Sequence, residues 1–402
     1  MASVAIDHMF SLIVFMAAIL LFIGIFNQSM GAAVAYQQHK VCATKNSDLL
    51  DAMLLNPGAP VTWGQSNDVI TSFGLHNPES AQYRLSPFSL MRLTSTVNPP
   101  VYCDRDGKYY NNLTSDFGSC LLTPIDNGNG NSVNYSLASE LLGINSIYGF
   151  QLTLTPTVAV SVEKTSTGSP LEFLVSADGS GSPLAYANVS YSLLLVNQEG
   201  EYPSFSTVSG EDNTDVTGSV SLSFAGVAGE SDSYALLVYV HLYGLSGMGY
   251  YVHDGLLDSV VPLVESFADG TINLVHSGTV GGPASSSSLS YNVSYVVLTE
   301  DYDLCQVALN DPDAVGVVNS ESDFSSITLP FDVGMLVLTY KDEVGNYGVA
   351  LAPWGLSALA YPVTFGGNPS GYDWVTTDFR QVTIGDVSYM AKLALWRLGG
   401  GG

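Results

Sequence analysis

Side chains that could carry enzyme chemistry are scattered through this chain of 402 residues. The six histidines stand at positions 8, 39, 76, 241, 253 and 276, without the H-x-x-x-H or H-x-H spacing that places two histidines on one metal ion. The sequence contains no G-x-S-x-G nucleophile elbow, phosphate-binding loop or dinucleotide-binding fingerprint. Residues 244–249 (GLSGMG) follow a predicted strand without leading into a helix. We therefore expect no catalytic residue and no enzymatic activity.

Acidic and amide residues cluster in three loops, which are the remaining candidates for a chemical site. They are residues 126–131, 211–215 and 301–303. Calcium takes six to eight oxygen ligands of this kind, but none of the loops has the spacing of an EF-hand. A carboxylate pair for glycoside hydrolysis stays open, although nothing in the sequence singles out one pair. We interpret the loops as solvated turns, with Ca²⁺ as the alternative and no other metal or cofactor expected.

Four cysteines suggest a small number of disulfides. Cys103 and Cys120 flank a short loop rich in Gly, Asn, Asp and Tyr, and in an oxidising compartment they are the natural pair. Cys42 and Cys305 remain as a second pair, which would tie the N-terminal segment to the last part of the chain. Free buried thiols are the alternative for these two residues.

Five N-x-[ST] sequons point to an exported glycoprotein. We interpret Asn27, at the end of an apolar run, as a chance match. The other four, which we predict as glycosylation sites, are Asn112, Asn134, Asn188 and Asn292.

Composition limits the partners of the chain. Asp and Glu number 37 against 11 Lys and Arg, which gives a net charge of −26. Nucleic acids and anionic lipid surfaces are bound through clusters of basic residues, so neither is an expected partner of the body of the protein. Hydrophobic residues nevertheless make up 46% of the chain and Tyr occurs 23 times, so large cores can form.

The N-terminal segment is the most distinctive element. Residues 9–26 (MFSLIVFMAAILLFIGIF) contain no charge and are close to the shortest helix that crosses a hydrocarbon layer of about 30 Å. Asp7 and His8 precede them in place of a basic flank. Residues 27–55 lack Pro and continue with largely helical spacing of apolar residues until the stop signal Asn56-Pro57-Gly58. We predict one helix in residues 1–56, of about 50 residues and roughly 75 Å, with an apolar half (9–26) and an amphipathic half (27–55). A membrane anchor with a separate second helix is the alternative.

The rest of the chain reads as β-rich, so the fold class is α+β. Residues 57–148 form a mixed region that packs on the helix, with helical turns at 86–93 and 136–144. From residue 149 short segments of alternating or apolar residues, bounded by turns, predict two antiparallel β-sandwiches at 149–255 and 256–398, before a Gly tail at 399–402. The predicted strands are 150–162, 170–177, 187–196, 218–224, 233–242, 271–276, 288–299, 326–329, 335–340, 348–352 and 386–396.

Two parts of the sequence resemble known families. The apolar helix, its continuation SDLLDAMLLNPGAPVTWGQ (residues 47–65) and FGLHNP (73–78) are similar to archaeal type IV pilin-like surface proteins. Pro183, Ala187, Val189, Thr217 and Gly218 follow the pattern of microbial immunoglobulin-like repeats, which specifies architecture and not a ligand.

The pilin resemblance implies a structural subunit of an extracellular filament. Apolar helices of many copies would bundle in the core, the β domains would form the sheath, and the chain would reside in the membrane before assembly. Asp7 could pair with the N-terminal amine of a neighbour. Adhesion, with host or cell-surface glycans as partners, is the implied role, and a monomeric membrane-anchored adhesin or minor pilin is the alternative. The residues expected in the core are Phe10, Leu12, Ile13, Phe15, Ile19, Leu20, Phe22, Ile23 and Phe26.

Overall fold

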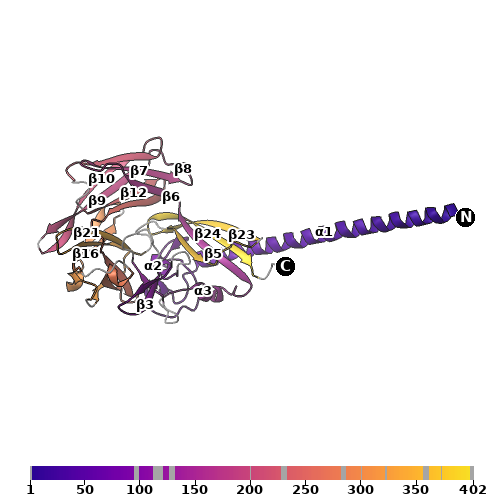
Figure 1. The fold of residues 1–402 in the computed structure, drawn as a ribbon, viewed down its shortest axis with the longest axis horizontal. Coiled ribbons are helices and arrows are strands. Elements are labelled where there is room, and N and C mark those ends of the chain that lie inside the picture. The colour runs from indigo at the N-terminus through magenta and orange to yellow at the C-terminus, as the bar shows by residue number, and fades with distance from the viewer. Residues whose placement is uncertain are drawn as a thin grey trace.

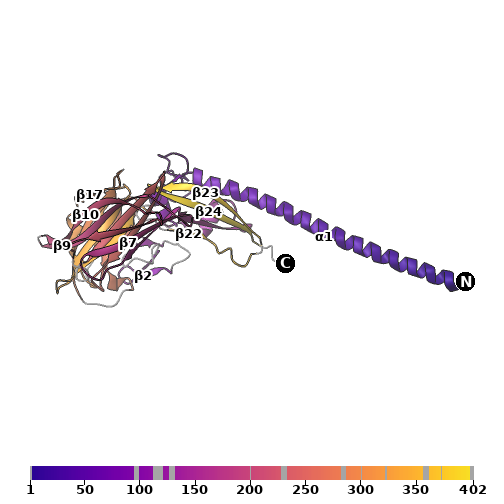
Figure 2. The same ribbon diagram turned by 90° about the horizontal axis from the view of Figure 1, so that it is seen from above.

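A computed structural model gives the fold as one long helix attached to a body built of β-sheets (Figure 1). The structure describes residues 2–94, 99–111, 121–125, 132–199, 201–227, 233–281, 287–299, 301–321, 324–355, 362–372 and 374–398. Figures 1 and 2 show the helix as a straight rod that projects from one end of the body, with the N-terminus at its far tip.

Helix α1 (Ala2–Leu55) is continuous over 54 residues, or about 81 Å. The prediction of one long helix is therefore confirmed, and a break into two separate helices is wrong. The helix ends where predicted because Pro57 lacks an amide hydrogen and Gly58 takes a left-handed conformation (φ +84°). The side chain of Asn56 fixes this turn by accepting a hydrogen bond from the amide of Gly58 (2.9 Å).

The last turns of α1 pack on a five-stranded sheet, here called the helix sheet. Its order is β1-β23-β24-β5-β22, in which β1 (Arg84–Leu85) runs parallel to β23 and the other neighbours are antiparallel. The other strands are β5 (Tyr148–Pro156), β22 (Val363–Gly366), β23 (Val375–Ile384) and β24 (Val387–Arg397). The sheet thus joins residues near 150 to the last strands of the chain.

This sheet corrects two sequence predictions. The segment 150–162 is not one strand, since β5 lies in the helix sheet and β6 (Val158–Lys164) lies in another sheet. Likewise, the last three strands do not belong to a β-sandwich over 256–398, because β24 pairs with β5 along nine residues from Tyr148 to Pro156. Residues 158–355 are therefore inserted between two strands of the helix sheet.

The first half of the insertion consists of two sheets packed face to face. The outer sheet has the order β11-β7-β6, with β8 beside β7; the middle sheet has the order β10-β9-β12-β13. Leu171, Phe173 and Val175 of β7 meet Leu236 and Val238 of β12 in their shared core. The bounds of these strands are β7 (Leu171–Gly179), β8 (Ser182–Pro183), β9 (Asn188–Glu199), β10 (Tyr202–Asn213), β11 (Ser219–Phe224), β12 (Tyr234–Leu242) and β13 (Leu245–His253).

The second half of the insertion also holds two sheets. The inner sheet has the order β17-β16-β20-β21, with β18 also paired to β16, and the side sheet has the order β14-β15-β19. A small sheet of β2 (Val101–Cys103), β3 (Lys108–Asn111) and β4 (Thr123–Pro124) joins the side sheet through a bridge from Leu122 to Leu263. The remaining bounds are β14 (Val260–Ser266), β15 (Thr271–His276), β16 (Leu289–Leu298), β17 (Leu304–Val307), β18 (Val315–Val318), β19 (Ser325–Thr328), β20 (Gly334–Lys341) and β21 (Tyr347–Trp354).

Strand β12 of the middle sheet and strand β20 of the inner sheet are buried on both faces. The middle sheet packs its second face on the inner sheet, where Ala235 and Leu237 of β12 meet Val337 of β20 and Val349 and Leu351 of β21. The other face of the inner sheet enters the largest core, which reaches through the helix sheet to Leu50 of α1. A continuous set of cores therefore connects the end of α1 to the rest of the body.

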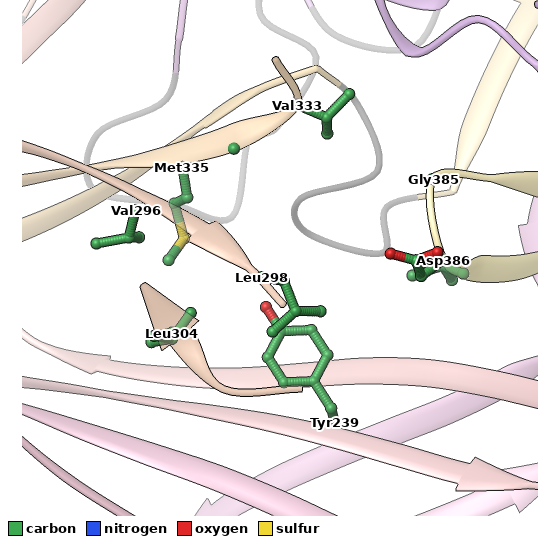
Figure 3. Close-up of a pocket in the computed structure, with 10 residues that line it drawn as sticks. Tyr239, Val296, Leu298, Leu304, Val333, Met335, Gly385 and Asp386 are labelled. Carbon is green, nitrogen blue, oxygen red and sulfur yellow. The ribbon is translucent and has the colours of Figure 1, made fainter. Parts of the chain in front are cut away.

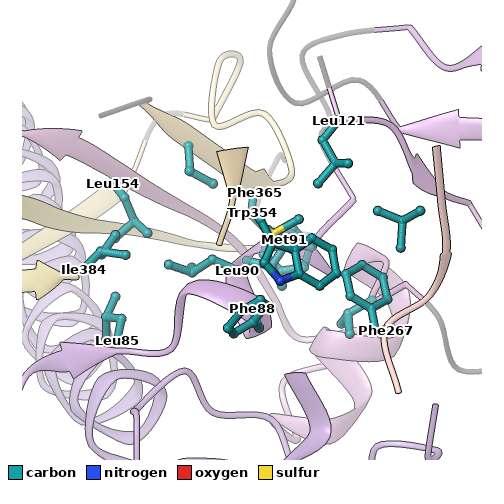
Figure 4. Close-up of a cluster of buried hydrophobic side chains, with 14 of the residues drawn as sticks. Leu85, Phe88, Leu90, Met91, Leu121, Leu154, Phe267, Trp354, Phe365 and Ile384 are labelled. Carbon is teal, nitrogen blue, oxygen red and sulfur yellow. The ribbon is translucent and has the colours of Figure 1, made fainter. Parts of the chain in front are cut away.

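Short helices in the predicted mixed region fill this largest core. Helix α2 (Pro87–Met91) lies within the predicted helical turn at 86–93, and helix α3 (Tyr135–Leu141) overlaps the one predicted at 136–144 but begins one residue earlier. Figure 4 shows Phe88 and Met91 of α2 beside Trp354, with Phe365 and Ile384 of the helix sheet in the same cluster. Residues 57–94 thus fasten the helix sheet to the inner sheet.

Candidate assembly helix

The free part of α1 exposes apolar side chains on every side. In the 18-residue window that is apolar enough to cross a membrane, none of the surface is buried, and the helix that contains it, His8–Leu55, is the one such candidate among the described residues. All nine residues predicted to form a filament core are exposed, from 39% for Ile19 to 70% for Phe22. A surface of this kind is stable only when lipid or other protein covers it. The side chain of Asp7 lies outside the described residues, so its pairing stays a prediction.

The uncharged part of the helix is longer than the apolar run. No Asp, Glu, Lys or Arg occurs in residues 8–39, which span about 48 Å of helix. Apolar side chains continue to be exposed beyond Phe26, with Met30 at 52%, Val34 at 50% and Tyr36 at 72%. A hydrocarbon layer of about 30 Å needs about 20 residues, so it leaves roughly the last 18 Å of this surface outside the layer.

A buried asparagine holds the base of the helix on the helix sheet. Asn46 is 1% exposed, and its Nδ2 donates hydrogen bonds to the carbonyl oxygens of Thr376 and Leu393 (3.1 Å each). The hydroxyl of Thr376 also donates to Sγ of Cys42 (3.5 Å). Because the two acceptors belong to the neighbouring strands β23 and β24, Asn46 fixes the position of the helix along its axis relative to the sheet.

An ion pair holds the next turn. Arg380 of β23 donates through Nε to Oδ1 of Asp51 (2.9 Å) and through Nη2 to Oδ2 of Asp51 (3.2 Å) and to Oγ of Ser47 (2.9 Å). A fourth contact joins Nη1 of Arg380 to Oδ1 of Asp378 at 3.0 Å. The hydrogen bonds with Asp51 raise the pKa of Arg380 above its ordinary value, so the guanidinium stays charged. Asn46, Asp51 and their sheet partners are called the helix clamp below.

One exposed tryptophan marks the point where the helix leaves the body. Trp374, just before β23, is 65% exposed and contacts the ring of His39 edge-on, with centroids 6.2 Å apart. The other three tryptophans, Trp63, Trp354 and Trp396, are at most 2% exposed. Sequence reasoning identified neither Trp374 nor the helix clamp.

The cysteines behave differently from the predicted pairs. Cys42 is half-buried on α1 against Thr376, whereas Cys305 is exposed on β17, and both are free thiols. The predicted disulfide between them is wrong, because both cysteines are free in the structure. Cys103 is buried and is also a free thiol in this structure, and burial raises the pKa of that thiol. Cys120 lies outside the described residues, so its bridge to Cys103 stays a prediction.

The sequons occupy three kinds of surroundings. Asn27 is exposed on the free helix. Asn134 is exposed at the N-terminus of α3, where its Oδ1 accepts a hydrogen bond from the amide of Leu137 (2.9 Å). Asn188 and Asn292 are half-buried in strands β9 and β16. Asn112 lies outside the described residues.

The loop predicted at 211–215 is wrong for residues 211–213, which form the end of β10 paired with β9; only residues 214 and 215 lie in the turn that follows. Oδ1 of Asp215 accepts hydrogen bonds from the hydroxyl and amide of Thr217 and from the amide of Ser219, and these bonds lower the pKa of Asp215. No group of three His, Cys, Asp or Glu side chains that could hold a metal occurs within the described ranges. Residues 126–131 lie outside those ranges.

A small cavity lies where the middle, inner and helix sheets meet. Tyr239, Leu298 and Met335 line it beside Asp386, which lies in the turn between β23 and β24 (Figure 3). Its volume is about 90 Å³. Ligand pockets usually measure about 300–1,000 Å³, so this cavity is a packing gap at a junction and not a substrate site.

Comparisons with known proteins leave the family open. No family model matches the chain, and no curated protein matches it. Among solved structures, trypsin-activated α2-macroglobulin from Escherichia coli is 11% identical with a TM-score of 0.23, over 71% of this chain and 23% of that chain. Methylamine-reacted α2-macroglobulin from Salmonella is also 11% identical, with a TM-score of 0.23, over 73% of this chain and 22% of that chain.

A third similar structure comes from a 1.5-MDa bacterial ice-binding adhesin, described in relation to host cell surface retention. It is 12% identical, with a TM-score of 0.17 over 56% of this chain and 69% of that chain. The chain thus spans under a quarter of the two α2-macroglobulins. At these TM-scores none of the three likenesses carries an argument about function.

Proposed function

We propose that this chain is a structural, non-enzymatic subunit of an extracellular archaeal type IV pilus-like filament. Copies of the protein would bundle their α1 helices in a core, and the β body would form the outer sheath. One observation carries the proposal: an uncharged helix of about 48 Å exposes apolar side chains on all sides, beyond what a hydrocarbon layer covers. Neighbouring helices would cover the whole length.

The helix clamp supports the same proposal. A subunit can transmit force or register to its neighbours only if its core helix is fixed to its body. Asn46 and the Asp51–Arg380 pair fix α1 to the helix sheet through buried or half-buried bonds. The face-to-face sheets of the inserted residues are consistent with immunoglobulin-like sheath domains, which we include in the proposal.

A second candidate function is a membrane-anchored monomer, such as an adhesin or minor pilin. It is favoured by the length of the apolar run at residues 9–26, which alone is nearly enough to span a hydrocarbon layer. In both cases the β body lies outside the cell and the helix passes through the membrane. The two differ in what finally covers the helix.

Expression of Leu20→Asp in cells tests the proposal. Leu20 is 67% exposed and contacts no part of the body, so a carboxylate there leaves the subunit intact but introduces a charge into the filament core. We expect sheared fibres from the wild-type protein and none from the variant. Val344→Asp, at a turn residue that is 87% exposed, is the matched control and should leave fibres unchanged. Fibres from Leu20→Asp at wild-type yield would refute the filament.

A further inference from the structure

A groove opens in the inner sheet where two strands separate along β16. Strand β17 pairs with β16 over residues 295–298, and β18 pairs with the same edge over residues 289–292. Val293 and Ser294 therefore lie between the two pairings, and residues 308–314 leave the sheet there. Strand β10 of the middle sheet forms the facing wall through Ser204 and Phe205. The groove measures about 460 Å³, within the usual range of ligand pockets.

Apolar residues make up most of the groove lining, with Phe205 as its one aromatic ring. The polar side chains among them are Ser204, Asn292, Ser294, Gln306 and Asp311. The side-chain amide of Asn292 makes no hydrogen bond to any described residue. Gln306 donates through Nε2 to Oγ of Ser294 (3.0 Å), which leaves its own carbonyl oxygen for a ligand. The one carboxylate, Asp311, is already engaged, because its oxygens accept from the amides of Asp313 and Thr328 (3.0 Å each). The half-buried ring of Phe205 adds an apolar surface.

This lining selects the chemistry of a ligand. No Lys, Arg or His is among the described residues that line the groove, so it offers nothing to an anion. An added peptide strand would need a longer free edge, because Val293 and Ser294 are the one stretch between the two pairings. Amide and hydroxyl groups around an aromatic ring instead suit a molecule with many hydroxyls and an apolar face.

We propose that this groove is a saccharide site for a neutral hexose or N-acetylhexosamine. Sugar hydroxyls would bond to Asn292 and Gln306, and the C–H face of the ring would pack on Phe205. Two sources supply the same chemistry. Asn292 and Ser294 form a sequon and both line the groove, so the sugar could be the first residue of a glycan on Asn292 itself, or it could belong to another molecule.

The groove lies in the half of the body far from α1, since Figures 1 and 2 both show β10 at the end of the body away from the helix. That end would face outward if α1 forms a filament core. This placement rests on the proposed function, but sugar binding by the groove does not.

The test uses the full chain, made without glycosylation and kept in detergent, with free N-acetylglucosamine, mannose and galactose as probes. Saturation-transfer NMR should show saturable binding of at least one sugar. We expect Asn292→Ala to weaken it about tenfold or more, because both polar groups are lost, and Phe205→Leu to weaken it several-fold. Asn188→Ala, which removes a half-buried strand asparagine outside the groove, is the matched control and should bind normally. Unchanged thermal melting of each variant shows that it folds.

A separate arm identifies the source. Mass spectrometry of the native peptide around Asn292 has two outcomes. A glycan that Ser294→Ala removes and Ser294→Thr retains would identify the sugar as part of this chain. An unmodified Asn292 would assign the site to an external sugar. Absence of binding by all three probes, or binding that neither Asn292→Ala nor Phe205→Leu weakens, would overturn the saccharide site. Because the detergent-held chain is not assembled, this result is independent of whether filaments form.

Discussion

A leucine-to-alanine substitution should have different effects at two positions of α1 if one part of the helix serves assembly and another part packs on the body. Leu20 is 67% exposed and touches no part of the body, whereas Leu50 is 0% exposed within the largest core. We expect Leu20→Ala to change assembly without changing the stability of the body. Leu50→Ala should destabilise the body.

The magnitudes follow from burial. Removing the buried side chain of Leu50 should lower the free energy of unfolding by about 2–5 kcal/mol, because a cavity remains. Leu20→Ala removes three carbons worth about 0.8 kcal/mol each when buried. Since about two thirds of this side chain is exposed in the subunit and available for burial, assembly should lose about 1.5 kcal/mol per subunit. That loss corresponds to a roughly tenfold higher critical concentration.

Two assays separate the effects. Urea unfolding followed by tryptophan fluorescence reports on the body, since Trp63, Trp354 and Trp396 are buried there. Sedimentation over a dilution series gives the critical concentration for assembly. The reasoning fails if Leu20→Ala lowers the free energy of unfolding as much as Leu50→Ala does, or if it leaves the critical concentration unchanged.

Three further predictions concern the body. Burial raises the pKa of Asp254 from 3.8 to about 6, where Tyr340 donates a hydrogen bond to it. The folded state therefore binds a proton more tightly than the unfolded state, and the free energy of unfolding should rise by up to about 3 kcal/mol as pH falls from 7 through 6 toward 4. Asp254→Asn should flatten that rise in urea titrations, and an unchanged slope would contradict the assignment. Asn46→Ala should cost about 1–3 kcal/mol and speed proteolysis between helix and body; equal cleavage rates would count against the clamp. If the chain is exported as proposed, peptide mapping of the native protein without reductant should give a peptide pair linked through Cys103 and Cys120, and alkylation of both thiols would show that the bridge is absent.

The helix could be predicted because its signals are local. An uncharged run, the absence of Pro and the sequence Asn56-Pro57-Gly58 fix the extent of α1 without reference to the rest of the chain. Exposure of Leu20 and its apolar neighbours follows from the same pattern, since a helix that is apolar on all sides cannot bury itself on one small body.

The sheet connections could not be predicted from local patterns. Alternation runs through Pro156 and Thr157 without interruption, although β5 and β6 belong to different sheets. The pairing of β5 with β24 joins segments more than 200 residues apart, which no periodicity records. One signal was present: the unbroken apolar runs of β12 and β20 indicate strands buried on both faces, as in a central layer.

The helix clamp and the groove also could not be predicted from the sequence, because both depend on contacts between distant segments. Asn46 reads as an ordinary polar residue of an amphipathic helix, and only the approach of Thr376 and Leu393 makes it a clamp. The groove at Asn292 arises because β17 and β18 pair with different parts of one strand. Its sequon was visible in the sequence, but the cavity beside it depends on the register of the sheet.

Cryo-electron microscopy of fibres sheared from the cell surface tests the central claim most directly. We predict a helical assembly whose core contains α1 helices packed side by side, with axes about 8–10 Å apart and the side chains of residues 9–26 in contact with neighbouring copies. The β bodies should surround this core. Isolation of the protein solely as a monomer whose α1 is surrounded by lipid or detergent would contradict the claim and favour the membrane-anchored form.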